Sequence, residues 1–264
     1  MGTLLRFRTV LVTATALLAA NLVLDAQRGA GGRGGAPPRP PREAAYFDLT
    51  GYWAAVVTED WRVRMTTPPK GDYSGVPLNA AGRKVADGWD PAKETGQGEA
   101  FCKAYGPPGL LRIPTRLQIT WTDDATLQLA TDAGTQTRTF RFGAPASAAA
   151  LSLQGTSVAA WFKQSQSKGF GPAPNEGPGT LRVVTTGLLA GHLRKNGVPY
   201  SEGTTVTEYF QRHSDFGSEW MTVLTIVDDP QYLARSFITS THFKREPDGS
   251  GFKPSPCEVA PPLK

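Results

Sequence analysis

The sequence predicts a mainly β domain, either an antiparallel barrel or a sandwich, with one or two short helices. About ten short runs are rich in aromatic and β-branched residues, which favour strands. Polar turn residues, chiefly Gly, Pro, Asn and Asp, separate these runs at regular intervals. Helical periodicity is scarce. The spacing suits a meander of hairpins that closes into a barrel.

Most of the expected strands alternate apolar and polar residues, as half-buried strands do. The expected strands are residues 51–58, 61–65, 116–121, 125–131, 135–142, 151–153, 181–186, 204–212, 220–227 and 236–244. Asp123-Asp124 and Asn196-Gly197 are expected turns. Asp228-Asp229-Pro230 ends the strand before it, because proline cannot donate a hydrogen bond to a neighbouring strand.

Three segments favour helix. Asn79 is a good N-cap for a short helix that runs to about Trp89. Residues 97–104 and 157–164 each suit a turn or two. The run 155–159 (GTSVA) approximates the G-x-S-x-G turn that exposes a serine nucleophile. The rest of that hydrolase pattern is missing, so a capped helix start at Thr156 or Ser157 is the simpler interpretation.

Residues 1–26 are predicted to be a secretory signal peptide. Two arginines precede an uncharged stretch from Thr9 to Leu24, and a small residue, Ala26, follows it. The uncharged stretch is shorter than the roughly 20 residues that a spanning helix needs. An uncleaved membrane anchor is the alternative. We therefore expect a periplasmic or secreted protein whose mature domain does not span the membrane.

Residues 27–45 are predicted to be a disordered spacer, because no apolar side chain there is larger than Ala or Pro. An arginine-rich tail that binds RNA or a membrane is the alternative. Residues 46–264 are expected to form a single β-rich domain. That domain carries 22 basic and 21 acidic residues, although the whole chain has a net charge of +5. A near-neutral domain lacks the basic surface of a nucleic-acid binder, so no nucleic-acid partner is expected.

Cys102 and Cys257 are the only cysteines of the chain. An even pair in an exported chain predicts a disulfide. The bond would hold the Pro-rich C-terminus, which has little apolar surface of its own. Two separate buried thiols are the alternative.

The densest charged cluster beside an aromatic residue surrounds Trp61. If Glu59 or Asp60 faces the mouth of a barrel, it could act as a general base or accept a hydrogen bond from a ligand. A solvated turn with a surface ion pair is the alternative.

Glu208 and Arg212 are charged residues on the apolar face of an expected strand. Charged groups on such a face lie either at a wet edge or in the interior as a pair. Inside a barrel, a Glu208–Arg212 or Glu208–Arg138 pair would be a polar spot that orients a small ligand. These three residues and Trp61 are the predicted ligand-binding residues.

His192, His213 and His242 are the three histidines of the chain. They are interpreted as surface or hydrogen-bonded strand histidines, and a three-histidine zinc site is the alternative. His213 and His242 could act in proton transfer, together with Glu208, Glu59 or Asp60. The sequence contains no zinc, calcium or nucleotide-binding motif, and we expect no metal and no cofactor.

The segment 47–53 (FDLTGYW) resembles the start of a lipocalin-type barrel, in which a G-x-W pattern opens the first strand. Gly51 and Trp53 match that pattern. In lipocalins the tryptophan packs across the closed bottom of the barrel, usually against a late arginine. The resemblance therefore implies a lipocalin- or calycin-like barrel, with Arg235 or Lys244 as the late basic partner.

A longer resemblance runs along most of the mature chain. The segments DLTGYW, TEDWRVRM, TPPKGDYSGVPLN, ITWTDD, LRKNGVPYSE, TEYF and FITSTHFK resemble a family of uncharacterised exported bacterial proteins. That family has no known activity. The resemblance implies a signal peptide, a spacer and one domain, and it adds no catalytic residue.

Three hypotheses follow for the function. The first is a binding module, a β-barrel that holds an apolar or amphipathic small molecule. The second is an enzyme on the same barrel, an isomerase, cyclase or hydrolase that uses carboxylate or histidine acid–base chemistry. The third is an interaction protein of the cell envelope. The sequence leaves open whether the protein is an enzyme.

Overall fold

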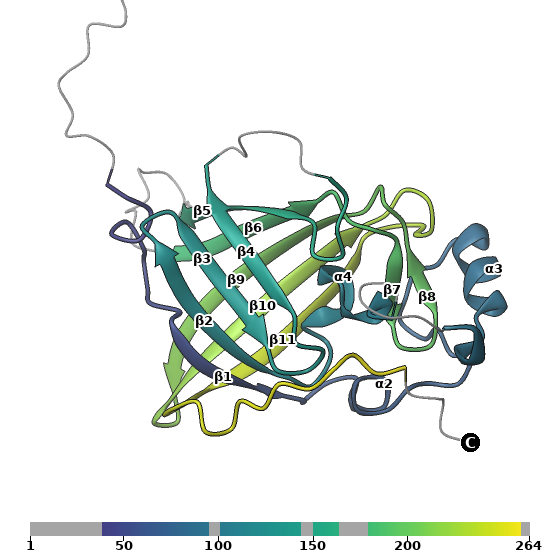
Figure 1. Ribbon diagram of the computed structural model, residues 1–264, viewed down its shortest axis with the longest axis horizontal. Coiled ribbons are helices and arrows are strands. Elements are labelled where there is room, and N and C mark those ends of the chain that lie inside the picture. The colour runs from purple at the N-terminus through teal and green to yellow at the C-terminus, as the bar shows by residue number, and fades with distance from the viewer. Residues whose placement is uncertain (1–38, 95–100, 144–149, 164–178, 260–264) are drawn as a thin grey trace, which may run out of the picture. The chain divides into compact units, whose positions relative to one another are not determined.

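Nine of the eleven strands in the described part of the chain close into one barrel (Figure 1). The structure is a computed structural model that describes residues 39–94, 101–143, 150–163 and 179–259. The predicted signal peptide and most of the predicted spacer lie outside these residues. The barrel strands are β1 Gly51–Val56, β2 Arg116–Asp123, β3 Thr126–Thr131, β4 Thr137–Phe142, β5 Thr156–Lys163, β6 Gly179–Thr186, β9 Thr205–Asp215, β10 Ser218–Asp228 and β11 Phe237–Glu246.

The order around the ring is β1-β11-β10-β9-β6-β5-β4-β3-β2. Neighbouring strands are antiparallel except β4 and β5, which are parallel. An odd number of strands cannot alternate in direction all the way around a closed ring, so one pair has to be parallel. The prediction of a mainly β fold is confirmed, and of the two expected architectures the chain forms the barrel.

Two insertions lie at the end of the barrel where β1 and β10 finish, which we name the insertion end (Figure 1). The hairpin of β7 and β8 comes between β6 and β9, and short helices come between β1 and β2. These elements are α2 Trp61–Met65, α3 Ala80–Gly88, η1 Pro91–Lys93, η3 Lys103–Tyr105, α4 Pro107–Leu110, β7 Gly191–Arg194 and β8 Val198–Tyr200. The described residues therefore contain more short helices than expected, and among these helices only α3 is longer than five residues.

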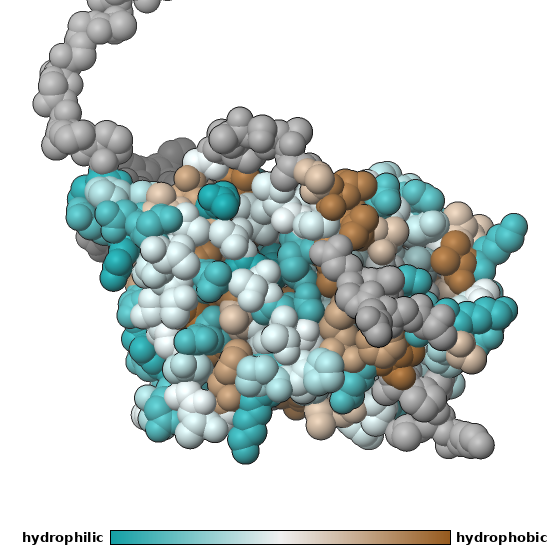
Figure 2. All heavy atoms as spheres, viewed as in Figure 1, coloured by the Kyte–Doolittle hydropathy of each residue, from teal (hydrophilic) through white to brown (hydrophobic). Residues whose placement is uncertain are grey.

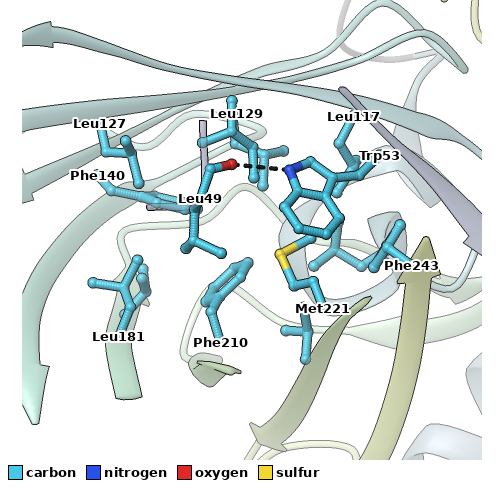
Figure 3. Close-up of a cluster of buried hydrophobic side chains, with 14 of the residues drawn as sticks. Leu49, Trp53, Leu117, Leu127, Leu129, Phe140, Leu181, Phe210, Met221 and Phe243 are labelled. Atoms are coloured by element: carbon cyan, nitrogen blue, oxygen red, sulfur yellow. Dashed lines mark hydrogen bonds between the residues drawn. The ribbon is translucent and has the colours of Figure 1, made fainter. Parts of the chain in front are cut away.

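Side chains from all nine barrel strands fill the interior, and Figure 3 shows large side chains of this core. Trp53 is fully buried there, and its indole Nε1 donates a hydrogen bond to the carbonyl oxygen of Leu49 at 2.9 Å. The largest buried side chains around it include Leu117, Leu127, Leu129, Phe140, Leu181, Phe210, Met221 and Phe243. The interior is a packed core, and the cavities discussed below lie outside it.

Arg245 is the late basic residue that packs on Trp53, with its guanidinium carbon 5.7 Å from the ring centre. The lipocalin resemblance implied Arg235 or Lys244 in this place. The register of β1 and β11 explains the difference, because it sets Trp53 opposite Arg245 and turns Lys244 to the other face of the sheet.

Residues 40–47 pack against the end of the barrel that lies opposite the insertion end. The indole of Trp161 on β5 donates a hydrogen bond to the carbonyl oxygen of Pro41 at 2.7 Å. The rings of Tyr46 and Phe47 meet Trp161 edge to face, with centroids 6.0 and 5.3 Å away. The part of the predicted spacer that the structure describes therefore lies against the barrel.

Three local predictions are wrong. Residues 61–65 form the helix α2, because alternation over only five residues is also compatible with one helical turn, and Asp60 O accepts hydrogen bonds from Val63 and Arg64. Residues 151–153 form only an isolated bridge at Ser152. Ser157 lies within strand β5, where its hydroxyl bonds that of Thr185 at 2.8 Å, so it starts no helix and occupies no nucleophile turn.

The predicted disulfide between Cys102 and Cys257 is confirmed, with Cα atoms 5.4 Å apart. The backbone N–H of Glu258 also donates to the hydroxyl of Tyr105 at 3.0 Å. Both contacts hold the C-terminal segment against η3, at the insertion end of the barrel.

Candidate binding groove at the insertion end

An open groove of about 650 Å³ lies at the insertion end. Its walls combine apolar and aromatic side chains with a few charged ones, which is typical of sites for small molecules. The lining residues are Ala81, Lys84, Val85, Gly88, Trp89, Glu94, Lys103, His192, Gly197, Gln231 and Tyr232. In Figure 2, brown apolar side chains interrupt the polar surface mainly towards the side where Figure 1 shows β7, β8 and α3.

Helix α3 forms one wall of this groove, and its start is fixed by its cap. The Asn79 side chain accepts a hydrogen bond from Gly82 N at 2.9 Å and donates one to the carbonyl oxygen of Gln231, also at 2.9 Å. A Cβ atom at Gly82 would collide with the carbonyl oxygen of Tyr232. Glycine at this position lets the helix lie directly on the β10–β11 loop, so α3 and this loop share one groove.

Trp89 follows α3 and is one of the aromatic residues that line the groove. It is 7 % exposed, and its indole nitrogen has no hydrogen-bond partner among the described residues. The β7–β8 turn packs on the ring at Gly197, where φ is 78° and a Cβ atom would overlap the indole. Asn196 holds the same turn through hydrogen bonds to the carbonyl oxygens of Pro69 and Asp72 at 3.2 and 3.0 Å.

Glu94, Lys103 and His192 form the polar side of the groove. Lys103 Nζ lies 3.5 Å from Glu94 Oε2, and His192 Nε2 lies 3.7 Å from Glu94 Oε1. Burial, and to a smaller extent the charge of Lys103, lowers the pKa of His192 to about 4. His192 is therefore neutral at pH 7.

Asp229 fixes the loop that carries the groove residues Gln231 and Tyr232. Burial favours its neutral form, but hydrogen bonds from Ser201 N, Thr204 and the backbone N–H groups of Gln231 and Tyr232 outweigh that effect and lower its pKa. The bonds from Ser201 N and Tyr232 N measure 2.5 and 3.1 Å. One carboxylate thus ties the start of β9 to the loop that lines the groove.

The predicted residue Glu208 pairs with Arg138, one of its two expected partners. The two side chains form two hydrogen bonds at 2.5 and 2.8 Å and are both fully buried in the barrel. Arg212 instead binds Glu219, with Nε and Oε2 2.6 Å apart. The Arg138–Glu208 pair does not line any of the cavities described here, so we treat it as part of the barrel core.

The predicted residues Glu59 and Asp60 bind arginines at the insertion end. Glu59 Oε1 lies 2.7 Å from Arg64 and 2.9 Å from Arg112, and Asp60 Oδ2 lies 2.6 Å from Arg112. The arginines, together with the hydroxyl of Thr58, lower the pKa of Glu59 even though burial opposes them. Trp61, the first residue of α2, is 65 % exposed.

The other predicted histidines lie on the barrel wall and not in the groove. His213 is exposed on β9, and His242 bonds the hydroxyl of Thr222 at 3.0 Å on the outer face. The described residues contain no group of three or more His, Cys, Asp or Glu that could hold a metal ion.

Sequence reasoning did not single out Glu94 or Trp89 as site residues, and it considered His192 only as one ligand of a three-histidine zinc site. His192 lies on β7, Glu94 follows η1 and Trp89 follows α3, so only the packing of α3 on the β7–β8 hairpin and the contact of Glu94 with His192 bring them together. The one local signal is the Asn196-Gly197 turn, which indicates a hairpin close to His192.

No protein family, curated protein or solved structure matches the chain. Among the described residues, no helix has both the length and the apolar character needed to cross a membrane.

Proposed function

We propose that this β-barrel protein is a binding module for an amphipathic small molecule, held in the groove at the insertion end. The observation that carries the proposal is the groove itself. Its volume of about 650 Å³ matches that of small-molecule sites, and Trp89 supplies an aromatic floor beside charged groups.

We also propose that the protein works outside the cytosol, in the periplasm or after secretion. The Cys102–Cys257 disulfide supports this location, because such bonds persist in oxidising compartments. The expected signal peptide points the same way.

Binding of an uncharged amphipathic dye such as Nile red tests the site. We expect saturable binding that raises dye fluorescence and quenches tryptophan emission. Val85 lines the groove and is 44 % exposed, so Val85→Glu places a charge in the groove without disturbing the core. We expect this variant to bind the dye about 10-fold more weakly, a loss of about 1.4 kcal/mol.

Leu224→Glu is the matched control, because Leu224 on β10 is 39 % exposed and does not line the groove. Equal loss of binding in both variants would refute the site. Native mass spectrometry of the protein from its own cells then identifies a retained ligand.

The contact between Glu94 and His192 favours a second candidate, a hydrolase that uses the same groove. Neutral His192 would take a proton from a water molecule as that water attacks an ester carbonyl, and would return it to the departing alcohol. Glu94 would stabilise the imidazolium that forms in between. Turnover of activated esters that is lost in His192→Gln and kept in His213→Gln would support this candidate, and no turnover in the wild type would reject it.

A further inference from the structure

A second cavity, of about 30 Å³, lies between α2, α4 and β7 and shares no lining residue with the groove. Four of its lining residues are basic: Arg64, Arg112, Arg194 and Lys195. The others are apolar or glycine. A space of this size holds about two water molecules or one small polar group.

The packing of α4 on β7 brings these basic residues together. A Cβ atom at Gly109 would lie 2.9 Å from the carbonyl oxygen of Leu193 and 3.1 Å from that of His192. Glycine therefore allows α4 to lie directly on β7. Arg112, just after α4, then comes next to Arg194 at the end of β7.

Arg64 is enclosed but only partly bonded. Its side chain is 1 % exposed. Its Nε donates to the carbonyl oxygen of Arg112 at 3.0 Å, and its Nη1 donates to Glu59 at 2.7 Å. Its Nη2 is buried and has no partner among the described residues. Buried guanidinium N–H groups are normally paired, because an unpaired one loses its hydration without replacement.

Arg194 presents the same situation on the opposite wall. Its Nη1 is buried and finds no acceptor in the described part of the chain. Burial, with smaller effects from Arg112 and Arg62, lowers its pKa, although Asp60 and Asp72 oppose the change. Burial and Arg112 likewise lower the pKa of Arg64.

The nearby acids are already engaged elsewhere. Glu59 and Asp60 bind Arg112, with Glu59 also binding Arg64, and Asp72 lies 2.8 Å from Arg62. Lys195 stacks on the ring of Tyr105, 5.4 Å from its centre. Within the described structure, Arg194 and Lys195 therefore have no acidic partner, and the cavity carries a surplus of positive charge.

From this geometry we infer that the cavity is a binding site for the carboxylate group of a small organic acid. A carboxylate has two acceptor oxygens, and the two unpartnered guanidinium nitrogens can supply one donor to each. The small volume suits a planar carboxylate better than a larger tetrahedral anion. The cavity has room for the carboxylate group alone, so the short hydrocarbon chain of the acid would extend out of it past the apolar lining residues, which include Val63, Ile113 and Phe237.

Titration of the full-length mature protein with butyrate, in a buffer free of other carboxylates, tests the site. Calorimetry should show saturable 1:1 binding of butyrate, and the melting temperature should rise with its concentration. Butyramide, the uncharged analogue, should not bind. Inorganic phosphate that binds at least as tightly as butyrate would overturn the assignment to a carboxylate, and no binding of either anion would overturn the site.

Arg194→Gln is the deciding variant, with Arg62→Gln as its matched control. Arg62 lies near the basic residues of the cavity, but its side chain is 59 % exposed and does not line the cavity. We expect Arg194→Gln to weaken butyrate binding at least about 10-fold and Arg62→Gln to leave it nearly unchanged. Equal affinities in both variants would refute the assignment.

The stability of the ligand-free variant separates binding from a structural role. Because the side chain of Arg194 makes no hydrogen bond among the described residues, Arg194→Gln should melt at or above the wild-type temperature when no acid is present. A lower melting temperature would show that Arg194 serves the fold, and it would overturn the inference. This test uses a charged ligand and a different cavity, so it can fail while the dye-binding groove stands.

Discussion

Arg138 on β4 and Glu208 on β9 form a doubly hydrogen-bonded ion pair across the inside of the barrel. The pair spans two intervening strands, and Thr185 on β6 accepts a further hydrogen bond from Arg138 Nη2 at 3.1 Å. The guanidinium group also lies 4.9 Å from the ring centre of Phe140. Both charges are removed from water, so each depends on the other for its stability.

Removal of one partner of this pair should be costly. We expect Glu208→Gln to lower the free energy of unfolding by about 3–5 kcal/mol, because it leaves Arg138 charged and uncompensated in the core. Urea denaturation measures the change. The double variant Arg138→Met/Glu208→Leu should recover most of the loss, since it removes both charges. A single variant as stable as the wild type would contradict the prediction.

His192 makes the stability of the protein depend on pH. Its pKa is lowered from 6.5 to about 4, so the unfolded chain binds a proton more readily than the folded one between these values. The contribution of neutral His192 to the free energy of unfolding is fully present above pH 6.5. It is lost as the pH falls towards 4. Between pH 7 and pH 5 we expect a loss of about 2 kcal/mol from this residue.

Urea denaturation at both pH values measures this effect. His192→Gln should lose that part of the pH dependence, whereas His213→Gln should keep it, because His213 is exposed. An unchanged pH profile in His192→Gln would show that other groups cause the dependence.

The contact between Gly197 and Trp89 can be isolated by two alanine variants. Gly197 and Gly217 both have positive φ, 78° and 65°, so both substitutions strain the backbone. A Cβ atom at Gly197 would also overlap Trp89, whereas one at Gly217 has no atom within 4 Å. We expect Gly197→Ala to destabilise the protein by at least about 1 kcal/mol more than Gly217→Ala. It should also shift the fluorescence of Trp89, and equal effects would exclude the contact as a constraint.

The disulfide should be a large contributor to stability. It closes a loop with a sequence separation of 155 residues, which corresponds to about 4–5 kcal/mol in the chain-entropy account. We expect the double variant Cys102→Ser/Cys257→Ser to unfold at a much lower urea concentration than the oxidised wild type. Reduced wild-type protein should match the variant, and any large difference between the two would indicate an effect of the serines themselves.

The strands could be predicted from the sequence because side-chain alternation is a local property of the chain. Runs such as 220–227 need only their own residues to be recognised, and the structure places β10 there. The parallel pairing of β4 with β5 could not be predicted in this way, because it depends on how the whole ring closes. Helix α2 was missed because five residues are too few to separate the two periods.

The candidate site was less accessible to sequence reasoning. Glu208 was predicted to form an ion pair because a charged residue on an apolar face needs a partner. In the structure that partner is Arg138. The contact between Glu94 and His192 left no such signal, because neither residue interrupts an apolar pattern. The resemblance to lipocalin-type barrels and the proposed roles of Glu59 and Asp60 in ligand binding stay predictions.

The pairing of β1 with β11 joins the first strand of the barrel to the last. During synthesis from the N-terminus, β1 leaves the ribosome long before β11 exists. Until Phe237–Glu246 has been made, β1 and β10 each keep an unpaired edge that can recruit strands of other chains. A polypeptide that ends before β11 therefore forms an aggregation-prone open sheet and not a smaller stable domain.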